Sequence, residues 1–114
     1  MGMQIEREVA TRSYTCPTGT PTAAQMLDCS GASGISIFVP TGLTVATLTF
    51  YGMNGNPDIS GGRTPIPIYN NSNAAVTLTV TNGRCYWAPE ELFAFPFIGI
   101  KGDVGDAIII AMKK

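Results

Sequence analysis

The sequence predicts a single-domain, all-β protein: a jelly-roll-like β-sandwich of about eight or nine short strands. Three observations support this fold class. Apolar and polar residues alternate with a period of two in several short segments, the spacing of a strand with one buried face. Clusters of glycine, proline and asparagine separate these segments, as turns do. The 114 residues are one domain's worth of chain, and no repeat period or second domain is visible.

The amino-terminal part of the chain differs from the rest. Residues 1–23 contain Pro17 and Pro21 within a threonine-rich stretch that shows no helical or strand period. Proline fixes φ and donates no backbone hydrogen bond, so this stretch is expected to be extended and irregular. The sequence therefore predicts an extended N-terminal arm over residues 1–23 and a β-sandwich domain over residues 24–114.

The arm is expected to become ordered only against a neighbouring subunit or another protein surface. Ordering each residue costs about 1–2 kcal/mol, and the arm has too few apolar side chains to offset that cost on its own domain. Its candidate interface residues are Ile5, Val9 and Tyr14. The alternative is that Met3–Val9 adds an edge strand to the protein's own sheet.

The strands of the sandwich domain are predicted in chain order. They are expected at residues 24–29, 35–39, 44–51, 64–69, 75–81, 84–87, 97–100 and 106–112. Pro65 and Pro67 cannot donate to a ladder, which predicts an edge strand at 64–69. The core is expected to contain Leu48, Phe50, Val76, Leu78, Val80, Ile108 and Ile110.

The sequence also makes specific predictions for one turn, one helical turn and the last strand of this domain. Asn82-Gly83 predicts a two-residue hairpin that returns residues 84–87 against the strand at 75–81. Pro89 followed by two glutamates predicts one short helical turn near 89–94. The last strand is apolar on both faces, which predicts a central strand covered on both sides.

Composition excludes several classes of function. Only 13% of residues are charged, the net charge is −1, and the sequence has no histidine. Without histidine, Ser-His-Asp and Cys-His nucleophilic sites and His-ligated zinc are excluded, so we expect no enzyme, no cofactor and no metal. No basic patch is available for nucleic acid or for a membrane surface, and no apolar run is long enough to span a bilayer.

The cysteines and the amino terminus bear on the cellular compartment. Cys16, Cys29 and Cys85 show no Cys-x-x-Cys spacing, and the first residues contain no apolar signal-peptide core. We therefore expect synthesis in a host cytoplasm, with the three cysteines reduced and buried. A Cys29–Cys85 or intermolecular disulfide is the alternative if the protein later meets oxidising surroundings.

Two small clusters of polar or aromatic residues have alternative interpretations. Asp103 and Asp106 follow Gly102 and Gly105 directly, a pattern that predicts a polar hairpin rather than a cation site. Trp87, Tyr51 and Tyr69 are the candidate sugar platform of an alternative function, carbohydrate binding or adhesion.

Several segments also resemble a known family. They are Ala46–Gly52, Pro65–Asn70, Val76–Tyr86, Pro89–Phe93 and Phe97–Asp103. Their succession resembles the strand pattern of small virion proteins of tailed bacteriophages, the head decoration or cement type, over about residues 34–112. The resemblance implies a jelly-roll-like fold, no catalytic residues and a place on the capsid surface of the virion. It also implies two kinds of partner: the major capsid protein, whose subunits it would stabilise, and copies of itself, as a homotrimer.

Overall fold

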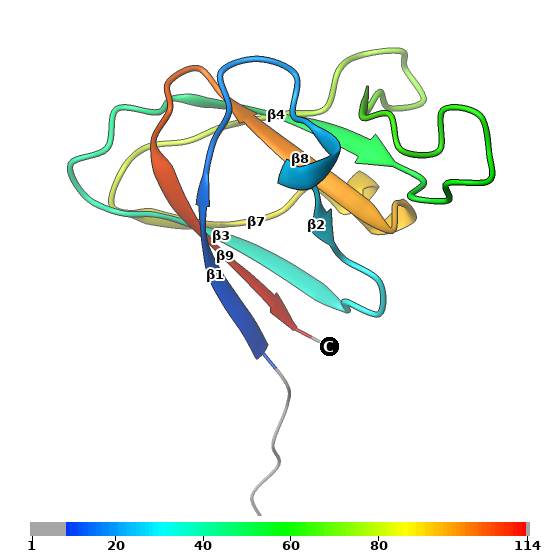
Figure 1. Cartoon of the computed structure of the whole chain (residues 1–114). Coiled ribbons are helices and arrows are strands. Elements are labelled where there is room, and N and C mark those ends of the chain that lie inside the picture. The colour runs from blue at the N-terminus through cyan, green and yellow to red at the C-terminus, as the bar shows by residue number, and fades with distance from the viewer. Residues whose placement is uncertain (1–8, 114) are drawn as a thin grey trace, which may run out of the picture.

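The structure, a computed structural model, describes residues 9–113, which fold into two antiparallel β-sheets packed face to face (Figure 1). The strands are β1 (Val9–Thr15), β2 (Leu27–Asp28), β3 (Gly34–Val39), β4 (Thr47–Met53), β5 (Ile66–Pro67), β6 (Thr77–Thr79), β7 (Arg84–Trp87), β8 (Phe97–Gly102) and β9 (Ala107–Lys113). Two 3₁₀ turns, η1 (Ala23–Gln25) and η2 (Glu90–Ala94), complete the described elements. The predicted all-β sandwich and the short helical turn near 89–94 are confirmed.

The two sheets draw their strands alternately from the chain. The four-stranded sheet has the order β1-β9-β3-β7. The five-stranded sheet has the order β2-β8-β4-β5, and β6 also pairs with β4. Most consecutive strands therefore lie in opposite sheets, so most connections cross from one layer of the sandwich to the other.

The core lies between the two sheets and is built from their inner faces. Its fully buried side chains are Leu27, Ile37, Val39, Leu48, Phe50, Leu92, Ile98, Ile100, Ile108, Ile110 and Cys16. Six of the seven predicted core residues are buried, and Leu78 is half-buried against the core. Val45 is also buried, although it precedes β4, which begins at Thr47.

The prediction of an arm over residues 1–23 is wrong for residues 9–15, which form β1, whereas residues 16–22 are irregular as predicted. β1 pairs with β9 along its whole length, from Val9 opposite Lys113 to Thr15 opposite Ala107. Tyr14 is buried in the protein's own core, where its hydroxyl accepts a hydrogen bond from Ile100 N–H at 3.1 Å. The ladder to β9 and the buried Tyr14 ring offset the entropy that the apolar content alone did not cover.

The remaining predictions for this region have separate outcomes. Tyr14 is a core residue of its own chain and not an anchor on a neighbour. Val9 belongs to β1, an edge strand that starts where the alternative edge strand at Met3–Val9 was expected to end. Ile5 and the rest of that expected strand lie outside the described residues.

The predicted hairpin at Asn82-Gly83 is also wrong. Gly83 has a φ of 76°, as a turn glycine requires, but Asn82 is not left-handed. The Gly83 N–H donates to the carbonyl of Val39 at 2.7 Å, and β7 continues along β3 rather than along β6. The turn therefore carries the chain from the five-stranded sheet to the four-stranded sheet, a role that the same dipeptide serves without closing a hairpin.

Candidate interaction surface

The outer face of the four-stranded sheet is the candidate functional surface. Strand register places its side chains in rows across the sheet. One row contains Thr11, Ala111, Ser36 and Trp87, and the next contains Ser13, Ile109, Phe38 and Cys85. The six of these residues that lie on β9, β3 and β7 are here called the apolar outer face. They are Ala111, Ser36, Trp87, Ile109, Phe38 and Cys85.

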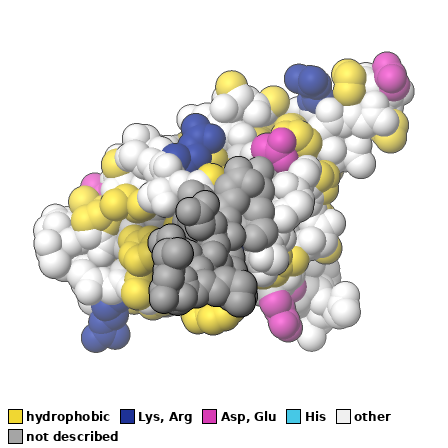
Figure 2. Space-filling view, turned by 90° about the horizontal axis from the view of Figure 1, so that it is seen from below, with side chains coloured by type: hydrophobic (Ala, Val, Ile, Leu, Met, Phe, Trp, Pro, Cys, Tyr) yellow, Lys and Arg dark blue, Asp and Glu magenta, His cyan; other side chains and the backbone are white. Residues whose placement is uncertain are grey.

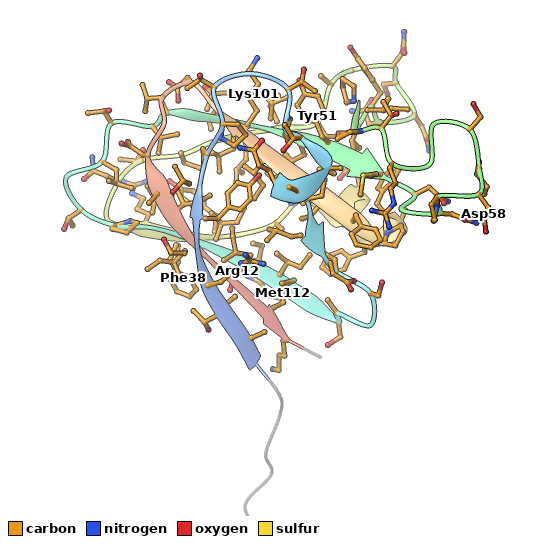
Figure 3. All side chains as sticks on the ribbon, in the orientation of Figure 1. Arg12, Phe38, Tyr51, Asp58, Lys101 and Met112 are labelled. Atoms are coloured by element: carbon orange, nitrogen blue, oxygen red, sulfur yellow. The ribbon has the colours of Figure 1, made fainter. Side chains whose placement is uncertain are left out.

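This face exposes large apolar side chains. Trp87 is 85% exposed and Phe38 is 40% exposed, while Ile109 and Ala111 beside them are half-buried. Phe38 lies on the side of the four-stranded sheet that faces away from the core (Figure 3). Figure 2 views the molecule from this side, and the part not covered by grey atoms has hydrophobic side chains beside uncharged polar ones and only scattered charges. Contiguous apolar groups of this kind on a surface mark interaction sites.

The apolar outer face is hollowed on both sides of Phe38. One hollow of about 390 Å³ is lined by Gly34, Ser36, Ala111 and Trp87, together with Ile35, Phe38 and the charged Lys113. The small side chains of glycine, serine and alanine form its floor, and Trp87 forms one wall. A second hollow of about 370 Å³ lies beyond Phe38, next to Cys85. Knobs and depressions therefore alternate over a few residues of the same sheet.

The predicted covering of the last strand is wrong on one side. β9 is central in its sheet, between β1 and β3, and Ile108 and Ile110 are completely buried on its inner face. Ile109 and Ala111 point to the outer face, where no other described segment buries them fully. The two apolar faces of β9 therefore have different environments: one lies in the core and the other on the surface.

The outer face of the five-stranded sheet has the opposite character. Threonines form its rows, with Thr47 opposite Thr79, and Thr49 opposite both Thr77 and Lys101. Elsewhere the chain covers this face itself. A Cβ placed on Gly99 would come within 2.5 Å of Met26 Sδ and 3.1 Å of the Pro21 ring, so the segment around η1 lies directly on β8. This outer face is polar where it is bare and covered where it is apolar.

The three aromatic residues of the alternative sugar platform do not share a surface. Tyr51 is buried, and it lies in the layer of η1 and the five-stranded sheet (Figure 3). Trp87 stands on the outer face of the other sheet. Tyr69, 57% exposed, lines a separate hollow of about 490 Å³ together with Asn71, Glu90 and Glu91. Each ring has a different environment, so any sugar contact would have to rest on one of them alone.

Asp103 and Asp106 act as structural hydrogen-bond acceptors. The Asp106 carboxylate accepts the N–H groups of Thr44 (2.8 Å) and Val45 (2.9 Å). The Asp103 carboxylate accepts the N–H groups of Ala46 (2.9 Å) and Thr47 (3.2 Å), and these bonds lower the pKa of Asp103. Together they fasten the β8–β9 loop to the segment that enters β4. The predicted polar hairpin is wrong, because β8 and β9 lie in different sheets and do not pair.

The three cysteines fall into two environments. Cys16 and Cys29 are buried, and burial raises the pKa of each thiol to about 11, with Asp106 adding to the effect at Cys16 and Asp28 at Cys29. Cys85 is exposed on the apolar outer face, against the prediction that it is buried, because outward-facing positions of β7 have no covering layer. All three thiols are free in the structure.

Within residues 9–113, no three His, Cys, Asp or Glu side chains lie close enough to hold a metal ion. No helix in that part of the chain has the length and apolar character needed to cross a membrane. Comparison of the chain with protein-family models, curated proteins and solved structures finds no match in any of the three.

Sequence reasoning missed the main feature of this surface. Trp87 was considered only as a possible sugar-binding ring, and Phe38, Ile109 and Ala111 were not singled out. The signal was present in the two-faced apolar pattern of residues 106–112, because an outward apolar face on a central strand requires either a covering layer or an exposed patch.

Proposed function

We propose that this chain is a non-enzymatic structural protein of a virion, of the head decoration or cement type, which associates with copies of itself and stabilises capsid subunits. The observation that carries the proposal is the apolar outer face, on which Trp87 stands 85% exposed. Low charge over the whole chain supports it, since the centres of protein interfaces are depleted of charged residues. The resemblance of residues 34–112 to decoration proteins supplies the virion setting.

The strand order supports the jelly-roll part of this proposal. A double-sheet jelly roll places the first and last strands side by side and distributes the others alternately between two four-stranded sheets. Here β1 lies beside β9, and β3 and β7 complete that sheet. β2, β8, β4 and the pair of short strands β5 and β6 form the other sheet. This order supports a jelly-roll topology in which one strand is divided in two.

The test is to measure copy number on particles. Virions released by the cells that carry the gene are purified on a density gradient, and the chain is quantified by mass spectrometry against the most abundant shell protein. A copy number comparable to that of the shell protein is expected of a decoration protein. Absence from particles, or only a few copies on each, would contradict the proposal.

A second candidate function has one observation in its favour. The hollow beside Tyr69 combines an exposed ring with the amide of Asn71 and the carboxylates of Glu90 and Glu91, a composition that offers stacking together with hydrogen-bond donors and acceptors. Glycan binding at this hollow is tested on a glycan array. Saturable binding that Tyr69→Ala abolishes and Trp87→Ala retains would favour this function.

A further inference from the structure

We propose that the apolar outer face is covered by the same face of a second copy, so that two chains pair sheet to sheet about a two-fold axis. This inference rests on the proposed function, since it names the partner through which the chain self-associates. It differs from the homotrimer that the resemblance implies, because a face that binds itself closes on two copies.

The shape of the face argues for a second copy as its occupant. An interface between identical faces requires each knob to meet a depression on the same surface. Trp87 is the knob, and the hollow of about 390 Å³ floored by Gly34, Ser36 and Ala111 is the depression. Both lie in neighbouring strands of one sheet, so one surface carries the two complementary parts.

Strand register gives the position of the axis. Ser36 on β3 lies opposite Trp87 on β7 on one side and opposite Ala111 on β9 on the other. A two-fold axis parallel to the sheet and running along β3 therefore exchanges the positions of β7 and β9. Trp87 of each copy then lies over the partner's Ala111, and the hollow receives the indole ring.

The charge distribution permits this pairing. The two positively charged side chains nearest the apolar outer face are Lys113 and Arg84, which lie at opposite ends of β3, at the levels of Gly34 and Val39. Within the face itself, the six residues are uncharged. These six residues can be buried without desolvating a charge, whereas Lys113 lines the hollow that receives the indole ring and Arg84 lines the second hollow.

The size of the face predicts weak pairing. Four strands about 4.8 Å apart, with up to seven residues at about 3.3 Å each, give at most roughly 450 Å² in projection. A standard interface removes about 800 Å² from each partner, and smaller ones belong to weak or transient pairs. We therefore expect dissociation in the micromolar range, which copies held close together on a particle would overcome by effective concentration.

Trp87 is the only tryptophan of the chain, so its fluorescence reports this surface without any substitution. The experiment follows emission and sedimentation of the full-length protein from about 1 to about 300 μM, a range that brackets weak pairs. The expected result is a monomer–dimer equilibrium in which emission shifts to shorter wavelength as the dimer forms. Labelling of Cys85 by a bulky maleimide should slow over the same range, because Cys85 lies on the covered face.

Two variants and two matched controls identify the surface. Trp87→Ala should weaken dimerisation by about ten-fold or more, as removal of a central aromatic residue does. Ala111→Arg should do the same by filling the hollow with a charge. Tyr69→Ala removes an exposed ring from elsewhere on the molecule, and Thr77→Arg adds a charge to the outer face of the other sheet, so both should leave dimerisation unchanged. Far-UV circular dichroism and thermal melting establish that each variant folds.

Each contrary result has a distinct meaning. A monomer throughout the range, a trimer, or a dimer whose tryptophan emission and Trp87→Ala affinity do not change would overturn the pairing of these faces. None of these results would by itself contradict the decoration function, since attachment to particles is measured separately by copy number. Conversely, a dimer that forms through Trp87 while the chain is absent from particles would retain the pairing and contradict the function.

Discussion

The two sheets of the sandwich bury similar apolar inner faces but have opposite outer faces. On the five-stranded sheet, threonine rows face solvent and the segment around η1 covers Gly99. On the four-stranded sheet, Trp87 and Phe38 stand exposed on bare strands. Because the first sheet packs into the core without an apolar exterior, the fold does not require one. The apolar outer face of the second sheet is therefore best explained by binding, and the following predictions test that difference.

The largest expected effect is a difference in stability between substitutions on the two faces of β9. Ile110→Ala should destabilise the monomer by about 2–5 kcal/mol, because it leaves a cavity in place of a completely buried side chain. Its neighbour Ile109 points outward, so Ile109→Ala should cost only about 1 kcal/mol while weakening self-association. Chemical denaturation of both variants measures the contrast. Equal losses of stability would show that the outer face of β9 belongs to the core.

The next effect concerns the link between the edge of the four-stranded sheet and the other layer. Tyr14→Phe removes the hydroxyl that accepts the buried N–H of Ile100, leaving that donor without a partner. A loss of about 1–3 kcal/mol in the free energy of unfolding is expected. Denaturant midpoints of wild type and variant provide the measurement. An unchanged midpoint would indicate that the hydrogen bond between the Tyr14 hydroxyl and Ile100 contributes little to stability.

A pair of glycine substitutions compares the covered outer face with the bare one. Gly99→Ala should destabilise by about 1–3 kcal/mol, because its Cβ meets the Pro21 ring and Met26 Sδ. In the monomer, Gly34→Ala should fall within about 0.5 kcal/mol of zero, since its Cβ meets only Lys113 Cβ at 3.8 Å. Melting temperatures at low concentration test the pair. A reversed order would mean that the η1 segment does not lie on β8.

A smaller effect depends on pH. Hydrogen bonds from Ala46 and Thr47 lower the pKa of Asp103 in the folded protein, so the folded state binds its proton more weakly than the unfolded state. The resulting stability is present above the ordinary carboxyl pKa of 3.8 and is lost as the pH falls through the lower folded value. Asp103→Asn should therefore make stability less dependent on pH in this acid range. Urea denaturation of both proteins across it measures the difference, and parallel pH profiles would refute the assignment.

The smallest effect leaves stability unchanged and reports accessibility alone. In dilute native protein, maleimide should modify Cys85 rapidly, while Cys16 and Cys29 react only after unfolding. Burial keeps these two thiols protonated by raising each pKa to about 11. Peptide mapping after timed labelling distinguishes the three sites. Early modification of Cys16 would contradict its burial beside the β8–β9 loop.

The sequence predicted the elements that depend on local pattern and failed where distant strands decide the outcome. Alternation around Leu48 and Phe50 identified β4 and its inner face, and proline next to paired glutamates identified η2. The turn at Gly83 was also placed correctly, but which strand β7 joins is set by β3, far away in the sequence. In the same way, nothing local to Tyr14 indicates the β9 partner or the Ile100 N–H that order it.

The pairing of β1 with β9 has a mechanical consequence. Val9 lies opposite Lys113, so the two strand ends leave the sheet side by side at one edge of the sandwich (Figure 1). Tension that pulls these ends apart loads the ladder one residue pair at a time, because antiparallel hydrogen bonds run perpendicular to the strands. The domain should accordingly open by unzipping at low force from this edge, releasing β1 while the five-stranded sheet is still intact. A pull between Val9 and the far end of β8 would instead act across the whole sandwich and meet greater resistance.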